Sequence, residues 1–199
     1  MGAGIVLASG SDIRKQLLLN AGLEFDISPA RIDEESIKQA LIAESAKPRD
    51  IADALAEFKA RKISEKNAHG LVIGCDQVLS FDGDLLSKPE TPEHARDQLR
   101  RLRDTTHHLH TAVVIYEDSQ PVWRKVATVR LRMRDFSDDY LDDYIARNWQ
   151  SIRHSVGGYK LEEEGVRLFS SVEGDYFAVL GLPLLDVLNY LTLRGALQT

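Results

Sequence analysis

The chain has 199 residues, 43% hydrophobic and 28% charged, which is typical of one water-soluble globular domain with a sizeable core. Its formal net charge of −6 at pH 7 argues against a general nucleic-acid surface or anionic-membrane surface. The single cysteine, Cys75, excludes an internal disulfide, and no apolar run approaches a membrane span, so a cytoplasmic location is expected.

The first predicted elements are a strand and a helix. The opening residues, MGAGIVLASG, lack the basic flank of a signal peptide and lead into an apolar run at Ile5–Ala8. A helical pattern follows from Asp12 to Asn20, and Gly22 is expected to end it. Between them, Ser9-Gly10-Ser11 offers free N–H groups at a helix start, and Arg14 adds a guanidinium suited to phosphate. The segment predicts an anion site or, alternatively, an ordinary capped helix.

A short strand and two helices come next in the prediction. The strand spans Glu24–Ser28, and the helices span about Ser36–Ala43 and Pro48–Glu65. Lys59 lies near the edge of the apolar face of the second helix, where a lone lysine is interpreted as solvated. The acids Asp33-Glu34-Glu35 are interpreted as surface residues, with a divalent-cation site as the alternative.

The stretch GLVIGCDQVLSFDGDLLSKP has the pattern of a catalytic segment. It predicts a buried strand at Leu71–Gly74 with Asp76 at its carboxyl end, followed by a strand at Val78–Phe81. The Asp82-Gly83 pair predicts a tight hairpin turn. Burying a carboxylate is costly unless it faces water, a metal or a substrate. Asp76 and Lys88 are therefore expected to face one cleft.

The second half of the chain continues the alternation of helices and strands. The predicted elements are, in order, a helix from Thr91 to Arg103, strands at Thr106–Tyr116 and Val122–Arg132, a helix at Ser137–Trp149, a strand at Tyr176–Leu180 and a final helix from Gly181 to about Leu193. His108 and His110 share one face of their strand, but no cysteine or Glu-x-x-His pattern accompanies them to favour zinc. The alternation predicts an α/β domain around a central sheet.

Short fragments spread over nearly the whole chain form an ordered set of motifs. They are Leu7-Ala8-Ser9-Gly10-Ser11, Ile32-Asp33-Glu34, Leu55-Ala56 with Lys59-Ala60, Ile73-Gly74-Cys75-Asp76-Gln77-Val78, Lys88-Pro89, Thr106-His107, Gly174-Asp175-Tyr176 and Gly181-Leu182-Pro183-Leu184. In this order they resemble the LASxS, VDE, LAxxKA, IGxDxV, GKP, TH, GDY and GLPL motifs of the Maf (septum-formation-inhibitor-like) family. Each fragment alone is weak, whereas eight in register are specific.

The resemblance implies a fold, an activity and an assembly. The fold would be of the Maf and inosine-triphosphatase type: one domain over residues 1–199, with two lobes that share a central twisted mixed β-sheet flanked by helices and leave a cleft between them. The activity would be hydrolysis of a nucleoside triphosphate to monophosphate and diphosphate, a house-cleaning reaction whose substrates include modified or non-standard nucleotides. The resemblance also makes a homodimer an expectation.

The roles of the family's residues carry over to ten positions. Asp76, Lys88 and Arg14 would be catalytic, with Asp76 orienting or deprotonating the attacking water, or holding the metal that binds it. Glu34 and Asp76 would hold a divalent cation, Mg²⁺ or Mn²⁺. The remaining residues would bind the substrate, the first three at the triphosphate and the last three at the base: Ser9, Ser11, Lys59, Gln77, Lys160 and Glu162.

Several positions depart from the family's pattern. Asp12 stands where proline is usual, Ile13 where arginine is usual and Ser87 where glycine is usual. Ser155 replaces the lysine of KAGAY. The combination of Asp76-Gln77 with Lys160 and Glu162 resembles the branch that takes modified guanosine triphosphates such as 7-methyl-GTP, since a carboxylate accepts from guanine N1–H and the exocyclic amine.

Three other interpretations of the chain are open at this point. The first is a nucleotide sensor without turnover that regulates cell division, as the family's historical name suggests. The second is a neighbouring pyrophosphatase chemistry that removes deaminated purine triphosphates. The third is a zinc-dependent hydrolase built on the histidine-rich strand.

Overall fold

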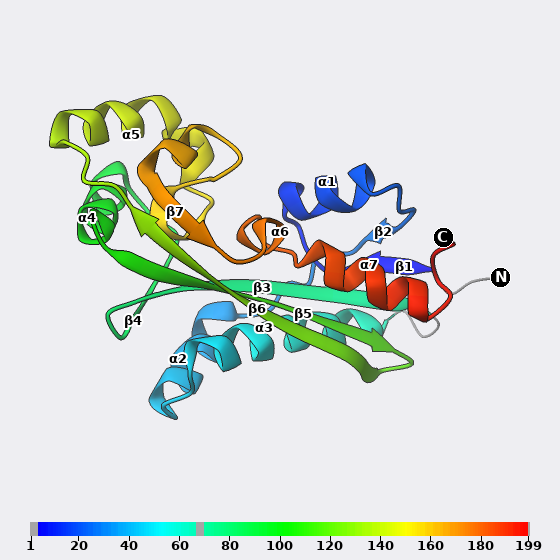
Figure 1. Ribbon diagram of the computed structural model, residues 1–199. Coiled ribbons are helices and arrows are strands. Elements are labelled where there is room, and N and C mark those ends of the chain that lie inside the picture. Colours follow the sequence, from blue (N-terminus) through cyan, green and yellow to red (C-terminus); the bar gives the residue numbers. More distant parts are fainter. Residues whose placement is uncertain (1–3, 67–69, 199) are drawn as a thin grey trace.

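The computed structural model describes residues 4–66 and 70–198, and its centre is a mixed β-sheet (Figure 1). The strands of the described chain are β1 Ile5–Leu7, β2 Asp26–Ile27, β3 Leu71–Phe81, β4 Asp84–Leu86, β5 Thr106–Glu117, β6 Gln120–Met133 and β7 Phe169–Glu173. Their order is β2-β1-β3-β5-β6-β7, with β4 paired to β3. The pairs β1–β2 and β1–β3 are parallel and the rest antiparallel, which confirms the predicted mixed sheet.

Helices cover both faces of this sheet and one of its ends (Figure 1). They are α1 Asp12–Asn20, α2 Glu34–Ala43, α3 Pro48–Ser64, α4 Pro92–Leu102, α5 Asp138–Ile152, the short 3₁₀ helices η1 Val156–Gly158 and η2 Glu164–Leu168, α6 Tyr176–Val179 and α7 Leu184–Leu193. Helices α2 and α3 lie on one face, and α1, α6 and α7 lie on the other. Helices α4 and α5 lie with β7 at the far end. The prediction of a sheet flanked by helices is confirmed.

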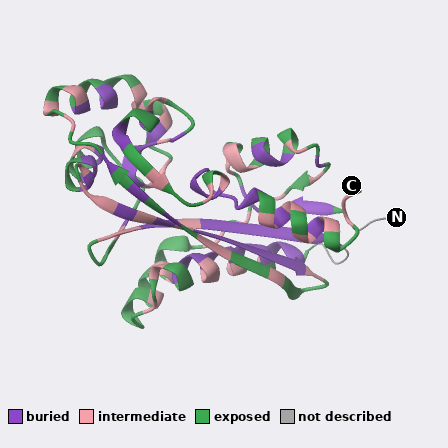
Figure 2. Ribbon diagram, in the orientation of Figure 1, coloured by how far each residue is buried: buried purple, intermediate pink, exposed green. Residues whose placement is uncertain are grey.

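Strand β3 passes through two separate groups of buried side chains (Figure 2). Leu71, Ile73 and Cys75 pack with α1 and α7 at one end of the sheet. Leu79 packs with α4 and α5 at the other end. A third group packs α3 against the opposite face of the sheet. Asp76 therefore lies on the strand where the first two cores meet.

The break predicted within β3 does not occur. The strand is continuous from Leu71 to Phe81, and Asp76 lies in its middle rather than at a carboxyl end. The reason is that every residue from Val72 to Ser80 pairs with β5, and Asp76 is opposite Ala112. The hairpin prediction is confirmed, because Asp82 and Gly83 both have positive φ angles, 51° and 85°, and join β3 to β4.

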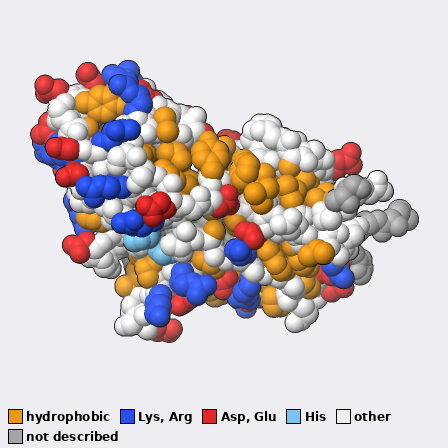
Figure 3. Space-filling model, in the orientation of Figure 1, with side chains coloured by type: hydrophobic (Ala, Val, Ile, Leu, Met, Phe, Trp, Pro, Cys, Tyr) orange, Lys and Arg blue, Asp and Glu red, His pale blue; other side chains and the backbone are white. Residues whose placement is uncertain are grey.

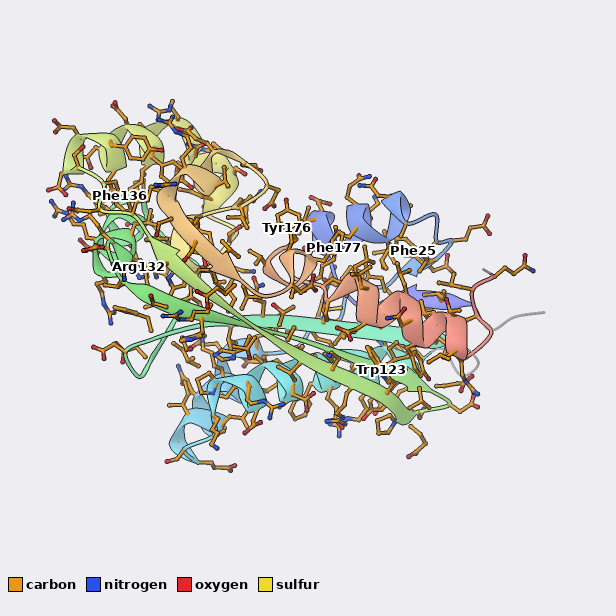
Figure 4. The ribbon with its side chains drawn as sticks, viewed as in Figure 1. Phe25, Trp123, Arg132, Phe136, Tyr176 and Phe177 are labelled. Carbon is orange, nitrogen blue, oxygen red and sulfur yellow. The ribbon has the colours of Figure 1, made fainter. Side chains whose placement is uncertain are left out.

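The predicted strand at Tyr176–Leu180 is wrong. Tyr176–Val179 forms the helix α6, because the Asp175 side chain accepts hydrogen bonds from the N–H groups of Phe177 and Ala178. Figure 4 places Tyr176 and Phe177 at this helix, close to α1. Strand β7, immediately before it, was not predicted, and β2 is shorter than the predicted Glu24–Ser28.

The observed ends of the other helices and strands agree closely with the predicted ones. Thr91 and Ser137 cap α4 and α5, accepting hydrogen bonds from the N–H groups of His94 and Tyr140. Within the described chain, no helix is both long and apolar enough to cross a membrane. The first three residues of MGAGIVLASG, on which the signal-peptide expectation partly rests, lie outside the described residues.

Candidate active site

All ten predicted site residues line a single cavity of about 840 Å³. This volume is within the range of small-molecule sites. The residues come from six parts of the fold: the β1–α1 connection with α1, the start of α2, α3, β3, the chain that follows β4, and the segment after η1. They are Ser9, Ser11, Arg14, Glu34, Lys59, Asp76, Gln77, Lys88, Lys160 and Glu162.

The centre of the cavity wall is an ionic cluster of a buried pair, Lys59 and Asp76, and the exposed Glu34. Lys59 Nζ lies 2.6 Å from Asp76 Oδ1 and 2.9 Å from Glu34 Oε1. The prediction that Lys59 is solvated is therefore wrong: its exposed fraction is 7% and that of Asp76 is 6%. Lys59 lies on the same face of α3 as the buried residues Leu55 and Ile63, so helix packing carries its ammonium group to β3.

Gly74 brings α3 close enough to β3 for this contact. A Cβ atom at Gly74 would lie 2.3 Å from the backbone oxygen of Ala56 and 2.6 Å from the backbone nitrogen of Ala60. Only a residue without a side chain permits this approach. Since Lys59 precedes Ala60 on the helix and Asp76 follows Gly74 by two residues, the same contact sets the Lys59–Asp76 pair.

Burial raises the pKa of Asp76, and the neighbouring charges of Lys59 and Arg14 oppose that shift. The carboxylate is thus desolvated but paired, which is a pattern common at catalytic positions. Burial also raises the pKa of Cys75 to about 11, so the thiol beside Asp76 stays protonated near neutral pH. Cys75 is consequently a packing residue rather than a nucleophile.

Arg14 connects the first helix to the chain that enters α7. Its Nε donates to the carbonyl of Gly181 at 2.6 Å, and its Nη1 donates to the carbonyl of Cys75 at 3.1 Å and to Ser9 Oγ at 3.2 Å. Among the described residues, Nη2 is left without a hydrogen-bond acceptor. The guanidinium is therefore held in one orientation with part of its donor capacity unused.

The segment before α1 has open backbone donors. Ser11 occupies the N-cap position, yet its side chain makes no capping hydrogen bond within the described chain. Its own N–H donates to Ser9 Oγ at 3.3 Å. A helix start with uncapped N–H groups, lying in a cavity with Arg14, has the chemistry of an anion site.

At the other side of the cavity, Gln77 has a restricted role. Its Nε2 lies 2.8 Å from Thr111 Oγ1, 2.9 Å from the Ala178 carbonyl and 3.1 Å from the Val179 carbonyl. These acceptors use both hydrogens of the amide, so Gln77 can offer a ligand only its carbonyl oxygen.

Lys160 and Glu162 also lie at this side of the cavity. Lys160 Nζ lies 3.1 Å from Glu163 Oε1, and Ser151 donates to the same carboxylate. Glu162 is exposed. This side of the cavity therefore presents carboxylate acceptors to a ligand, together with the ammonium group of Lys160, which its ion pair with Glu163 holds in place.

The implied divalent cation can be tested against the donors present. Asp76 and Glu34 converge on one point, which the ammonium group of Lys59 occupies. No group of three potential metal ligands occurs in residues 4–66 and 70–198. Two carboxylates are nevertheless what Mg²⁺ uses when substrate phosphates and water complete its coordination, so the residues fit such an ion.

The histidine-rich strand does not build a metal centre in the described chain. His108 and His110 stack at 6.3 Å on one face, as their spacing predicted. His107 is fully buried on the other face, where its Nε2 lies 2.8 Å from the hydroxyl of Tyr159. His107 is therefore a core residue.

The structure adds residues to the cavity that the sequence did not single out as site residues. Lys38 lines it together with Glu35, its partner at 2.6 Å, and so do His154 and Tyr159. Lys38 could have been found from its position on the same helix as Glu34, one turn further on. His154 and Tyr159 have no such signal, because only the packing of the η1 segment brings them to the cavity.

A second, smaller hollow of about 420 Å³ lies between α3 and β6. Three of its charged side chains are already paired: Arg124 and Asp53 with each other at 2.6 Å, and Lys125 with Asp186 at 3.0 Å. It lacks the combination of buried acid and several cations found in the larger cavity.

The chain is similar to known proteins along nearly its whole length. The family model described as "Maf-like protein" matches residues 4–193. The chain is 63% identical to a nucleoside triphosphate pyrophosphatase of Ruegeria pomeroyi over 98% of each chain. It is 63% identical to one of Roseobacter denitrificans over 97% of each. It is also 44% identical to a 7-methyl-GTP pyrophosphatase of Brucella abortus over 92% of each.

Proposed function

The chain belongs to the Maf family, and from this membership we propose that it is a hydrolase of nucleoside triphosphates. The reaction is cleavage of the α–β phosphoanhydride by water, which yields a nucleoside monophosphate and diphosphate. The observation that carries the proposal is the buried Lys59–Asp76 pair, which the exposed Glu34 also contacts, in a cavity that also holds Arg14 and Lys88.

In the proposed mechanism, Asp76 accepts a hydrogen bond from the attacking water and takes its proton as the bond to phosphorus forms. Arg14, Lys59 and Lys88 face the phosphate chain and stabilise the negative charge that builds up on the leaving diphosphate. Backbone N–H groups at Ser9–Ser11 bind phosphate oxygens at the start of α1. Positioning and electrostatics supply most of the rate in this class of reaction.

A divalent cation, Mg²⁺ or Mn²⁺, would be held by Glu34 and Asp76 together with the substrate's phosphates. When bound, it would neutralise charge on the phosphate oxygens. The convergence of both carboxylates on one cationic group supports this assignment.

For the base, we propose a guanine, including its modified forms. Gln77 can offer only an acceptor, and Glu162 is a second acceptor in the same cavity. Guanine presents N1–H and an exocyclic amine as donors to such groups. The Brucella abortus relative named for 7-methyl-GTP supports the same choice.

The decisive experiment measures diphosphate release by the wild type and Asp76→Asn over a panel of nucleoside triphosphates. The panel contains GTP, 7-methyl-GTP, ITP, XTP, UTP and CTP, with added Mg²⁺ or Mn²⁺. We expect Asp76→Asn to lower the rate by about 10²- to 10⁴-fold, because the acceptor for the water proton is lost.

The matched control for that experiment is Asp84→Asn, whose carboxylate pairs with Arg101 at the surface. It should retain the wild-type rate. Equal rates for the wild type and Asp76→Asn would contradict the mechanism, and nucleotide binding without any turnover would favour the sensor interpretation.

Two further expectations from the sequence stay predictions. A homodimer is proposed on the family resemblance, and exposed apolar side chains over α6 and α7, among them Tyr176 and Leu185, support it (Figure 3). Sedimentation equilibrium measures the assembly.

A cytoplasmic location is proposed from the single buried cysteine, and cell fractionation tests it.

A further inference from the structure

The chain around Lys88 is fixed on both sides of the lysine. On one side, the Ser87 carbonyl accepts a hydrogen bond of 3.0 Å from Gln98 Nε2 on α4. On the other, Pro89 is buried, and its Cγ lies 3.8 Å from the point that a Cβ at Gly158 would occupy. The Lys88 side chain itself is exposed in the cavity. The backbone thus determines the direction from which the Lys88 side chain enters the cavity.

Gln98 is an unusual residue for its position. It has an exposed fraction of 4% and lies on the face of α4 whose other buried residues, Ala95, Leu99 and Leu102, are apolar. Its Oε1 is buried and has no hydrogen-bond partner in the described chain. An unsatisfied buried acceptor costs stability, so a leucine of similar volume would serve the core as well or better.

The amide nitrogen of Gln98 explains what the residue contributes. A backbone carbonyl only accepts, so the NH₂ group must face Ser87, as it does. The same nitrogen lies 3.0 Å from His94 Nε2, one turn earlier on α4. His94 Nδ1 in turn lies 3.4 Å from the Glu90 N–H.

We propose that Gln98 is a positioning residue that acts through Lys88, by fixing the carbonyl of Ser87 so that the lysine ammonium group reaches the phosphates. The inference rests on the proposed function. A lysine is a point charge on a flexible stem, so its backbone anchor has a large influence on where the charge lies. A misplacement of about 1 Å can cost up to about 10²-fold in rate.

The test is a double-mutant cycle with Gln98→Leu, Lys88→Ala and the combined variant, using kcat/KM for diphosphate release from the best nucleotide. Gln98→Leu should lower kcat/KM by about tenfold and leave Tm unchanged or higher, since it removes the unsatisfied oxygen. In the Lys88→Ala background, Gln98→Leu should have no further effect, because the charge it positions is absent. Effects that multiply would overturn the inference.

Two additional variants guard against misinterpretation. Leu102→Ala removes a fully buried side chain from the same helix, so it should lower Tm while kcat/KM stays at the wild-type value. Gln98→Met repeats the cycle if Gln98→Leu does not fold. A wild-type kcat/KM retained by Gln98→Leu or Gln98→Met would also overturn the inference.

The failure of the inference differs from the failure of the proposed function. If the wild type releases no diphosphate from any nucleotide, the proposed function is wrong, and the cycle is then run on the Kd of GTP measured by calorimetry. Coupling between Gln98 and Lys88 in that Kd still supports positioning of the lysine, whereas independent effects contradict it.

Discussion

At Lys59, one ammonium group is shared by two carboxylates from different parts of the chain. The pair with Asp76 is buried, whereas Glu34 is largely exposed, so the two contacts differ in strength. Removing the lysine would leave the buried carboxylate without its main opposing charge. The residue is thus both a structural partner and a candidate phosphate ligand.

Replacement of Lys59 by methionine is expected to change the pH dependence of activity. Burial raises the pKa of Asp76, and Lys59 is the largest influence that lowers it, so the variant's pKa should rise further. If Asp76 must be ionised, the acid limb of kcat/KM should move to higher pH, and the rate should fall by about 10²-fold or more. A pH–rate profile measures this, with the exposed Lys66→Met as control.

The same raised pKa has a consequence for stability. The folded protein binds the Asp76 proton more tightly than the unfolded chain, so ionisation of Asp76 lowers the free energy of unfolding as pH rises above about 3.8. Because Lys59→Met should raise the pKa of Asp76 further, it should widen the pH range over which this stability is lost. An acid limb at the wild-type position would show that Lys59 does not control the ionisation of Asp76.

His107 should make the protein sensitive to acid. Burial lowers its pKa from 6.5 to about 4, so the unfolded chain binds the proton more readily between these values. The contribution of His107 to the free energy of unfolding is therefore full above pH 6.5 and is lost as pH falls towards 4, by about 3 kcal/mol in total. Urea unfolding of the wild type and His107→Gln at pH 4.5 and 7 measures this difference.

The expected result is a smaller loss of stability on acidification in His107→Gln than in the wild type. Asp76 titrates in part of the same range with the opposite sign, but it is present in both proteins and cancels. His108→Gln, on the other face of β5, is the control and should behave as the wild type. The prediction fails if His107→Gln loses as much stability on acidification as the wild type and the His108→Gln control do.

At the scale of elements, the site depends on how closely α3 packs on β3. Lys59 and Asp76 meet only because the helix backbone lies directly over Gly74. The 3.6-residue period of α3 and the two-residue period of β3 then bring the two side chains to the same place. A change in the distance between α3 and β3 should therefore alter stability and activity together.

Gly74→Ala is therefore expected to destabilise the protein strongly. The new Cβ would lie within 2.6 Å of backbone atoms of Ala56 and Ala60, which cannot rotate away. Overpacking of this kind costs about 3 kcal/mol, and the displaced helix should also separate Lys59 from Asp76. Urea unfolding and diphosphate release measure the two effects.

Gly4→Ala is the matched control, because no atom lies within 4 Å of its added Cβ. It should be close to wild type in both measurements. Wild-type stability in Gly74→Ala would mean that α3 can move away from β3 at little cost.

At the scale of the molecule, the cavity joins segments that are far apart in the chain. The β1–α1 connection, α3, β3, the chain after β4 and the η1 segment all contribute, and Arg14 connects α1 to the Gly181 carbonyl. A ligand that contacts all of these segments binds the folded state alone. Ligand binding should consequently stabilise the whole fold.

A GTP analogue that cannot be cleaved between the α and β phosphates should raise Tm. At about 100 times its Kd, the gain is about 2.7 kcal/mol, or roughly 5–10 °C for a chain of this size. With EDTA in place of Mg²⁺, the shift should be much smaller, because Glu34 and Asp76 would then face the phosphates without a divalent cation and with only the single charge of Lys59 beside them. Differential scanning fluorimetry measures both conditions.

GMP, which lacks the diphosphate, is the control ligand and should give a smaller shift than the analogue. An equal shift with Mg²⁺ and with EDTA would contradict the role proposed for Glu34 and Asp76 in holding a cation.

The sequence by itself determined most of the element types, and its resemblance to a known family gave the central mixed sheet and a set of candidate site residues. Local signals suffice for the element types: apolar periodicity, the caps at Thr91 and Ser137, and the Asp82-Gly83 turn. The family resemblance named ten residues, and all ten are among those that line the large cavity. The sequence failed at Tyr176–Val179, where a capping contact from Asp175 outweighs a strand-like composition.

Only the tertiary structure decided how those residues act. By its local pattern Lys59 is a solvated lysine, and the pattern around Asp76 places it at the end of a strand. Both interpretations are wrong because pairing with β5 continues through Asp76 and the packing of α3 buries Lys59 against it. The role inferred for Gln98 also depends on contacts between α4 and the chain after β4. Burial and partners come from residues distant in sequence, and a local pattern cannot contain them.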